Sequence, residues 1–262
     1  GPRSRQASDG RHVRDAHTMK ALLRWIGLGL LAFVALQLFF VGRIALMAVV
    51  DPESTSFQRS EAWAQIADRG GVRWRQEWVA YGGIADTLKR AVIASEDDGF
   101  VNHDGVDWNA IEAAWEKNAR AEAQFQKRQD AAPARAVRPA KIVGGSTITQ
   151  QLAKNLLLSG ERTLLRKGQE FVLTLALEHL LSKQRILEIY LNSVEWGDGV
   201  FGAEAAAQHY FRKSAARLSA AEAARLAVML PQPKRFEKTP NSAYLSGRAR
   251  VIMGRMGSAE LP

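Results

Sequence analysis

The chain of 262 residues contains no cysteine. Disulfide bridges and thiolate metal sites are therefore excluded, and a chain without thiols suits an oxidising compartment such as a periplasm. Histidine occurs only five times, and the sequence contains no phosphate-cradling P-loop, no metal-binding helix with two histidines and no plausible Ser-His-Asp arrangement. These absences argue against a P-loop nucleotide hydrolase, a metalloenzyme with a two-histidine helix and a hydrolase with a Ser-His-Asp triad.

Charge is absent from "WIGLGLLAFVALQLFFVG", residues 25–42, and after Arg43 the apolar run continues as "IALMAVV". Roughly 20 residues rising 1.5 Å each are enough to cross the hydrocarbon core of a bilayer, and Arg43 can extend its charge to the interface. We predict an uncleaved transmembrane anchor over residues 20–50. A buried core helix and a cleaved signal peptide are the alternatives; the lack of polar positions disfavours the first, and the lack of a clear small-x-small site disfavours the second.

Charged residues flank the predicted anchor unequally. Lys20 and Arg24 lie on its N-terminal side, whereas Asp51 and Glu53 follow it. The positive-inside rule then places the N-terminus in the cytoplasm and the chain from residue 51 outside. Residues 1–19 are interpreted as a cytoplasmic tail or an expression remnant, with Met19 as a candidate natural start.

The remaining chain reads as one mainly α-helical domain. A Ser/Thr-containing linker, residues 51–56, precedes a domain predicted over residues 57–262, and apolar spacing predicts several helices. The expected helices cover residues 84–95, 148–158, 163–182, 183–194 and 218–230. Residues 116–141 are polar, basic and rich in Ala and Pro, so we expect a mobile loop there. The net charge of +9 favours a phosphate-bearing partner: nucleic acid, anionic lipid or a phosphorylated substrate.

The segment "ASEDDGFVNHDGVDW", residues 94–108, crowds ionisable groups between apolar flanks. Glu96 is either a solvated surface acid or an acid placed for chemistry. Apolar neighbours such as Ile93 and Phe100, together with the charges of Asp97 and Asp98, are expected to raise its pKa. A lone histidine in such a context, His103, is more often a structural hydrogen bonder than a base.

The segment "GGSTITQQLAKN", residues 144–155, combines a glycine turn with hydroxyls, amides and one lysine. Thr147 and Gln150 have the spacing of a capping box, and Gln150 and Lys154 are four residues apart and so are expected on one helix face. A well-capped helix with a solvated face is the plain interpretation. A glycine turn at a helix N-terminus with a nearby lysine also makes a plausible anion site.

A basic cluster follows in "ERTLLRKGQE". Arg166 and Lys167 lie four and three residues before Glu170, so surface ion pairs worth about 0.3–0.5 kcal/mol each are the interpretation that the pattern alone favours. The functional alternative joins Lys154, Arg162, Arg166 and Lys167 into a site for a diphosphate, whose charge needs several cations at once.

Five segments occur together in a fixed order: "EDDGFVNHDGVD" (96–107), "GGSTITQQLAKN" (144–155), "RKGQE" (166–170), "KQRILEIYLN" (183–192) and "AAQHYFRKSAARLSAAEAARLAVMLPQP" (206–233). The chain resembles the peptidoglycan glycosyltransferases of glycosyltransferase family 51, and more narrowly their monofunctional, membrane-anchored biosynthetic type. The resemblance covers about residues 57–255, and five ordered motifs make it highly specific. One departure is Arg212, where the family often has Gly after Tyr-Phe.

The resemblance implies a mainly α, lysozyme-like, two-lobed domain beside the membrane. Such enzymes polymerise lipid II, a disaccharide-pentapeptide on undecaprenyl diphosphate. The GlcNAc 4-hydroxyl of an incoming lipid II attacks the anomeric carbon of the growing chain, the lipid diphosphate leaves, and the configuration inverts.

The resemblance also assigns roles by motif position. Glu96 corresponds to the general base, and Glu170 to a second glutamate that assists the diphosphate side. Lys154 and Arg162 match cations that bind the donor diphosphate. The remaining matched positions are the cleft-lining Ser146, Gln150 and Gln151, the supporting Asn155, Arg166 and Lys167, and Asp97, which we count with the substrate-binding residues.

For cofactors and partners, the resemblance implies no tightly bound group and no fixed metal site, with Mg²⁺ or another divalent cation at the substrate diphosphate. Expected partners are lipid II, undecaprenyl-diphosphate-linked glycan, the membrane, and other cell-wall synthesis or divisome proteins, but no nucleic acid. The expected location is the bacterial inner membrane, with the catalytic domain in the periplasm.

Two other function classes compete with this reading. A lysozyme-like hydrolase would also use carboxylates, but neutral glycan cleavage needs no cation cluster. A membrane-anchored scaffold or nucleic-acid binder would use the positive charge, but the predicted topology removes the domain from the cytoplasm. A transpeptidase is not expected, because the pattern Ser-x-x-Lys occurs nowhere in the sequence.

Overall fold

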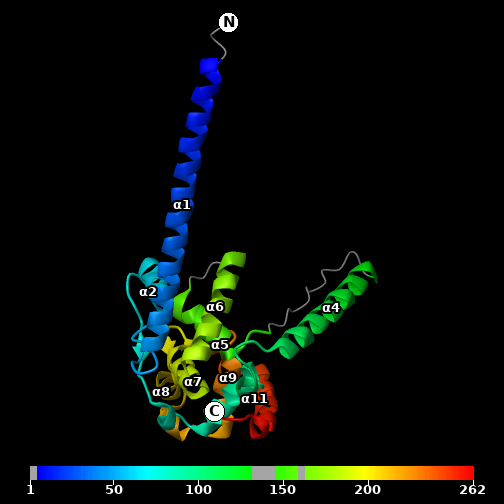
Figure 1. The fold of residues 1–262 in the computed structure, drawn as a ribbon. Helices are drawn as coiled ribbons and strands as arrows, with labels where there is room; N and C mark the ends of the chain where they lie inside the picture. The colour runs from blue at the N-terminus through cyan, green and yellow to red at the C-terminus, as the bar shows by residue number, and fades with distance from the viewer. Residues whose placement is uncertain (1–4, 132–144, 159–162) are drawn as a thin grey trace. The chain divides into compact units, whose positions relative to one another are not determined.

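The computed structural model describes residues 5–131, 145–158 and 163–262, with side chains from residue 19 onward. The chain divides into two compact units, Gly1–Leu46 and Met47–Pro262. The first unit consists of one long helix, α1 (Arg5–Leu46) (Figure 1). Within it, Met19–Leu46 has a mean hydropathy of 2.1 over its most apolar window, and none of that window is buried. This exposure is consistent with the predicted membrane anchor and not with a core helix.

The second unit is mainly helical, with one small three-stranded sheet of order β1-β3-β2. Strands β1 and β3 pair in parallel and β2 and β3 antiparallel. The helices are α2 (Ser56–Arg69), α3 (Asp86–Glu96), α4 (Trp108–Ala131), α5 (Ile148–Leu157), α6 (Leu164–Leu180), α7 (Lys183–Ser193), α8 (Ala203–Phe211), α9 (Ala220–Met229), α10 (Pro233–Glu237) and α11 (Ala243–Arg255). The strands are β1 (Arg75–Gln76), β2 (Glu195–Gly197) and β3 (Val200–Phe201), and short 3₁₀ turns cover Tyr81–Gly83, Phe100–Asn102, Ala215–Arg217 and Met256–Ser258.

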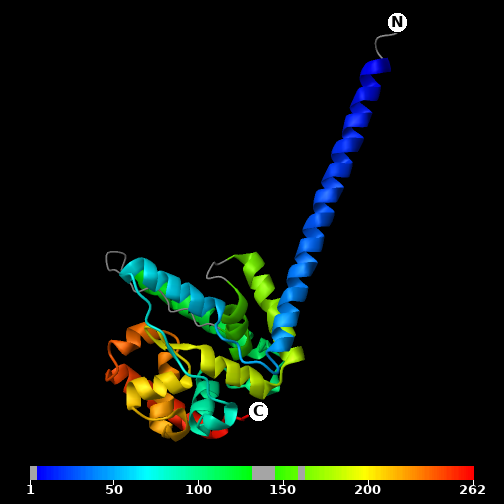
Figure 2. The same ribbon diagram turned by 90° about the vertical axis from the view of Figure 1, so that its left-hand side faces the viewer.

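The helices of this unit form two packed clusters. In one, α3 packs against α9 and α11; in the other, α5 packs against α2, α6 and α7 (Figure 2). Helix α3 buries Leu88 and Val92 completely, and α5 buries Ile148 and Leu152 completely, so each helix is held by its apolar stripe. The clusters meet where α3 ends and α5 begins, since the Asp97 carboxylate accepts a 2.9 Å hydrogen bond from the backbone N–H of Ile148.

The prediction of a mobile loop over residues 116–141 is wrong for residues 116–131, because α4 continues to Ala131. Residues 116–131 contain neither Pro nor Gly, and their Ala, Glu, Gln, Lys and Arg residues are strong helix formers. No residue of α4 is buried, so the polarity that suggested a loop belongs to a solvated helix, which extends away from its neighbours in Figure 1. Residues 132–141 lie outside the described part of the chain.

Arg212 ends α8 in the left-handed conformation, with φ 55° and ψ 39°. This conformation costs an ordinary L-residue about 1–2 kcal/mol and costs glycine little at a helix C-terminus. The Arg212 side chain forms no ion pair with the described residues. We expect Arg212→Gly to raise the melting temperature by about 2–4 °C for each kcal/mol gained, measured by calorimetry. The control is Arg250→Gly, an exposed interior position of α11, which should lower stability by about 1 kcal/mol; a lower melting temperature for Arg212→Gly would contradict the strain argument.

Candidate active site

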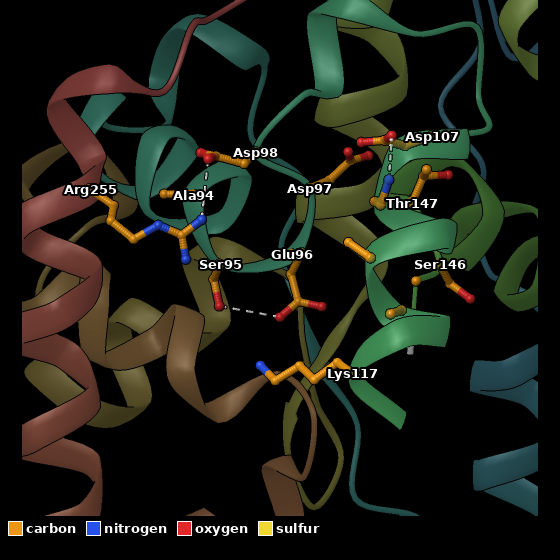
Figure 3. A pocket seen from close by; sticks show the side chains of 14 residues that line it. Ala94, Ser95, Glu96, Asp97, Asp98, Asp107, Lys117, Ser146, Thr147 and Arg255 are labelled. Atoms are coloured by element: carbon orange, nitrogen blue, oxygen red, sulfur yellow. Dashed lines mark hydrogen bonds and ion pairs between the residues drawn. The ribbon is translucent and has the colours of Figure 1, made fainter. Parts of the chain in front are cut away.

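One cavity lies at the junction of α3, α4 and α5, and we call it the acid cavity. Its volume is about 320 Å³. Figure 3 shows the Glu96 carboxylate and the Lys117 side chain among the side chains that line it. Its polar lining comprises Ser95, Glu96, Asp97, Asp98, Asp107, Lys117, Ser146, Thr147 and Arg255.

Glu96 is the last residue of α3 and is half-buried. Gln151 Nε2 donates to Glu96 Oε2 at 3.1 Å, and Ser95 Oγ donates to Glu96 Oε1 at 3.4 Å. Burial chiefly raises the pKa of Glu96, and the charge of Asp97 adds to this, whereas the two hydrogen bonds oppose it. The expected contribution of Asp98 is not found, since its carboxylate lies 3.2 Å from the guanidinium of Arg255. A carboxylate with a raised pKa is a stronger proton acceptor than a free glutamate.

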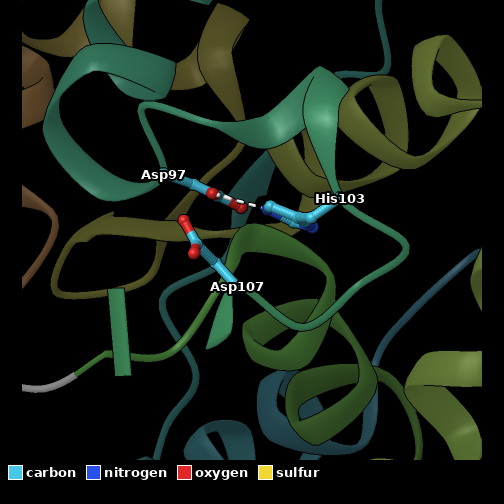
Figure 4. Close-up of side chains that lie close together, drawn as sticks. All are labelled: Asp97, His103 and Asp107. Carbon is cyan, nitrogen blue, oxygen red and sulfur yellow. Dashed lines mark hydrogen bonds and ion pairs between the residues drawn. The ribbon is translucent and has the colours of Figure 1, made fainter. Parts of the chain in front are cut away.

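Asp97 holds the two motif helices together. Its Oδ1 lies 2.8 Å from His103 Nε2 (Figure 4), and its Oδ2 accepts from the Ile148 N–H. His103 Nδ1 accepts from the Gly105 N–H at 3.1 Å, so the Nε2–H of the neutral ring is the donor to Asp97. The expected structural role of His103 fits this geometry. The expectation that Asp97 binds substrate stays a prediction: each of its oxygens has one protein partner, and the residue also lines the acid cavity.

The same residues form a candidate metal group. Ligand atoms of Asp97, His103 and Asp107 all lie within 4.8 Å of one another (Figure 4). Asp107 Oδ1, however, accepts from the Ala110 N–H at 2.8 Å at the start of α4, and Asp97 and His103 are bonded as described above. The internal bonds account for this group, and a role in holding helix ends explains it without a metal ion.

The second cavity, which we call the cation cavity, has a volume of about 470 Å³. Helix α5 contributes Gln151, Lys154 and Asn155, which are three and four residues apart and therefore share one helix face. Arg166 of α6 joins them. The other polar side chains of the lining are Ser60, Glu61, Tyr190 and Glu195.

Gln151 connects the residues of the two cavities. Its Nε2 donates to Glu96, and its Oε1 accepts from the Tyr190 hydroxyl at 2.9 Å. Burial, reinforced by the charges of Glu96 and Asp97, raises the pKa of Tyr190 well above its usual value, so the phenol keeps its proton and fixes the amide orientation. The two hydrogen bonds, from Tyr190 to Gln151 and from Gln151 to Glu96, therefore connect the Glu96 carboxylate to side chains that line the cation cavity.

Glu170 is buried, with a side chain only 4% exposed. Its Oε2 accepts from Arg166 Nη1 at 2.9 Å, and its Oε1 accepts from Lys167 Nζ. The interpretation as a surface ion pair is wrong for Arg166, because its acceptor is buried and its own side chain is only 17% exposed. Lys167 is 53% exposed, so its pair with Glu170 lies nearer the surface. Glu170 thus orients Arg166, and neither Glu170 nor Lys167 is among the residues lining the two cavities.

The structure distributes the predicted site residues unevenly. The acid cavity contains Glu96, Asp97 and Ser146, and the cation cavity contains Gln151, Lys154, Asn155 and Arg166. Gln150 belongs to neither: its Oε1 accepts from the Thr147 N–H at 3.1 Å, and the side chain is buried in the predicted capping box. Gln150 and Lys154 are four residues apart within α5 as expected, but the Gln150 side chain caps the helix and is buried, whereas Lys154 is exposed. Arg162 lies outside the described residues.

Several lining residues were not predicted. Tyr190 lies within the motif "KQRILEIYLN", which helps to carry the family resemblance. The motif could have pointed to Tyr190, but no role was assigned to this residue. Lys117, Arg255, Glu61 and Glu195 reach the cavities only through tertiary packing, and no sequence spacing connects them to the motifs.

The chain matches known proteins over most of its length. A model of the transglycosylase family matches residues 63–257. A biosynthetic peptidoglycan transglycosylase of Paraburkholderia phytofirmans is 53% identical over 233 residues, which cover 88% of this chain and 90% of the relative. Proteins with the same description from Burkholderia thailandensis and Herminiimonas arsenicoxydans are 51% and 50% identical and cover 93% of this chain and 90% and 99% of their own lengths.

Proposed function

The chain belongs to the transglycosylase family of peptidoglycan glycosyltransferases, with that family's lysozyme-like fold, and we propose that it polymerises lipid II by inverting transfer of the growing strand. The donor is the glycan linked to lipid diphosphate, and the acceptor is the GlcNAc 4-hydroxyl of lipid II. The observation that supports this most strongly is the placement of Glu96 beside the cation cavity, joined through Gln151.

In the proposed mechanism the two cavities have separate tasks. The acceptor sugar enters beside Glu96, which takes the proton of the attacking 4-hydroxyl. The oxygen then forms a bond to the donor's anomeric carbon as the bond from that carbon to the diphosphate breaks. Lys154 and Arg166 stabilise the diphosphate as it gains charge, and Glu170 holds Arg166 in place. By resemblance, Arg162 adds a further cation.

The membrane is part of this proposal. Helix α6 exposes Leu164 and Leu165 by 92% and 88%, and Phe171, Val172 and Leu175 are also exposed. Contiguous exposed apolar side chains favour contact with a partner or a bilayer. Together with the apolar helix α1, they support a domain that meets lipid-linked substrate at the surface of the inner membrane, on its periplasmic side.

The deciding experiment is polymerisation of purified lipid II by the full chain in detergent, with and without a divalent cation. We expect glycan strands in which many disaccharides are joined. A higher rate with Mg²⁺ would indicate that the cation assists at the substrate diphosphate. Shortening of isolated sacculi without growth of strands from lipid II would instead identify a hydrolase and would overturn the proposal.

A further inference from the structure

Three charged side chains form a cluster that the proposed mechanism does not use: Glu61 of α2, Glu195 of β2 and Lys234 of α10. Lys234 Nζ hydrogen-bonds Glu61 Oε2 and lies 3.5 Å from Glu195 Oε1. One ammonium group therefore serves two carboxylates, and the cluster has an excess negative charge when all three groups are ionised. Glu61 and Glu195 also line the cation cavity, so this charge faces the ligand that Lys154 and Arg166 would bind.

Glu195 is the less satisfied of the two acids. Its side chain is 6% exposed, and the nearest cation to its buried Oε1 is Lys234 Nζ at 3.5 Å, a long ion pair without hydrogen-bond geometry. A buried, ionised oxygen that is so weakly compensated is unfavourable, and protonation would remove the charge and provide a donor instead. Burial raises the pKa of Glu195 to about 7, with the charge of Lys234 opposing and that of Glu61 reinforcing the shift.

The surroundings of Glu195 contain charged and titratable groups of both signs. In the cation cavity the cations are Lys154 and Arg166. Among the described residues, the charged and titratable groups near Glu195 include Glu61 of α2, Lys154 of α5, Arg166 of α6, Tyr190 of α7, Asp198 between β2 and β3, Tyr210 of α8, and Lys234 and Glu237 of α10. Burial chiefly raises the pKa of Tyr210, and the charges of Glu237 and Glu195 add to this. Neither that phenol nor Tyr190 therefore ionises near neutral pH, and Glu195 is the group poised to exchange a proton.

We propose that Glu195 takes up one proton from solvent when a lipid-linked diphosphate enters the cation cavity, and that the neutral carboxyl then donates a hydrogen bond to this ligand. The inference rests on the proposed function. An arriving anion disfavours the ionised carboxylate and so favours its protonation. The proton comes from bulk water and is bound at the carboxyl oxygen; no other bond forms or breaks.

This coupling has a definite sign with respect to pH. Below about pH 6 Glu195 is already protonated, so binding takes up no proton there. Above the free pKa of about 7, binding must first add the proton, and affinity falls by up to about tenfold per pH unit for one proton. The fall ends above the pKa of Glu195 in the bound state, where the carboxyl stays ionised.

The test is calorimetric titration of the full chain in detergent with a lipid II derivative whose GlcNAc 4-hydroxyl is methylated, so that it binds but cannot act as acceptor. Both phosphates of this probe are esterified, so neither titrates near neutrality. Repeating the titration in buffers of different ionisation enthalpy counts the protons taken up. We expect uptake that approaches one proton between pH 7 and 8 and is near zero at pH 5.5.

Two variants separate Glu195 from its neighbours. Glu195→Gln is close in shape and cannot ionise, so it should take up no proton and bind more tightly than wild type at pH 8.5. Glu61→Gln releases Lys234 to pair with Glu195, so the uptake should move to lower pH. Glu260→Gln, an exposed acid near the C-terminus, should behave as wild type in every titration.

The outcomes discriminate between the inference and the function on which it rests. A wild-type chain that polymerises lipid II and binds the probe without proton uptake, or a Glu195→Gln variant with unchanged uptake, overturns the inference and leaves the function standing. A chain that neither polymerises lipid II nor binds the probe overturns both. Uptake in wild type that disappears in a folded Glu195→Gln variant supports the inference.

Discussion

Glu96→Gln is expected to lower lipid II polymerisation by about 10²–10⁴-fold, the usual effect of removing a general base. The amide keeps the size of the side chain but cannot accept the proton of the attacking hydroxyl. The measurement is the initial rate of strand formation at saturating lipid II, where binding contributes least. Binding of the blocked lipid II derivative should change little, since the lost step is proton transfer.

The pKa of Glu96 also predicts the pH dependence of the reaction. A base acts only when deprotonated, so the rate should rise as pH passes through a value above the ordinary glutamate pKa of about 4.3, because burial raises it. The stability effect has the opposite sign: a folded-state pKa that is raised means stability that is present at low pH and lost as pH rises through that pKa. Gln cannot ionise, so Glu96→Gln should be at least as stable as wild type at neutral pH.

The matched control for this prediction is Asp104→Asn, the same acid-to-amide change at an exposed position of the same motif. It should polymerise lipid II at nearly the wild-type rate. If Glu96→Gln retains activity within a few-fold of wild type, the assignment of Glu96 as the base is wrong.

Much of the helical architecture could be predicted because it depends on local patterns. The helix expected at 163–182 is α6, the one expected at 183–194 is α7, and the capping box at Thr147 starts α5 as its spacing indicated. A capping box is a bond between residues three apart, so sequence alone specifies it.

Other features could not be predicted because they depend on which surfaces meet. Gln150 and Gln151 are adjacent amides in one motif, yet capping buries the first and the cavity exposes the second. Glu195 becomes a candidate only when α2 and α10 bring Glu61 and Lys234 to it. Gly105 of the first motif likewise has a tertiary cause: its φ is +87°, and a Cβ there would lie 2.6 Å from Thr174 Cγ2 on α6.

The second large effect is expected for Lys154→Ala, which should lower kcat/KM for lipid II by roughly 10- to 150-fold. A charge-assisted contact contributes about 1.5–3 kcal/mol, and about 1.4 kcal/mol corresponds to a tenfold change in rate. The loss grows if the contact strengthens as the diphosphate departs. Lys154→Arg retains the charge and should recover part of the rate.

The fold should survive this change, which makes the kinetic result interpretable. Lys154 is an exposed residue in the last turn of α5, and alanine is the better helix former. Lys213→Ala is the control, because it breaks the Lys213–Glu222 ion pair at the surface, where such pairs contribute about 0.2–1 kcal/mol to stability. That control should leave polymerisation unchanged. A Lys154→Ala variant with equally unchanged kinetics and an intact circular dichroism spectrum would show that Lys154 does not contact the diphosphate. Removing a cation that contacts the departing diphosphate must slow its departure.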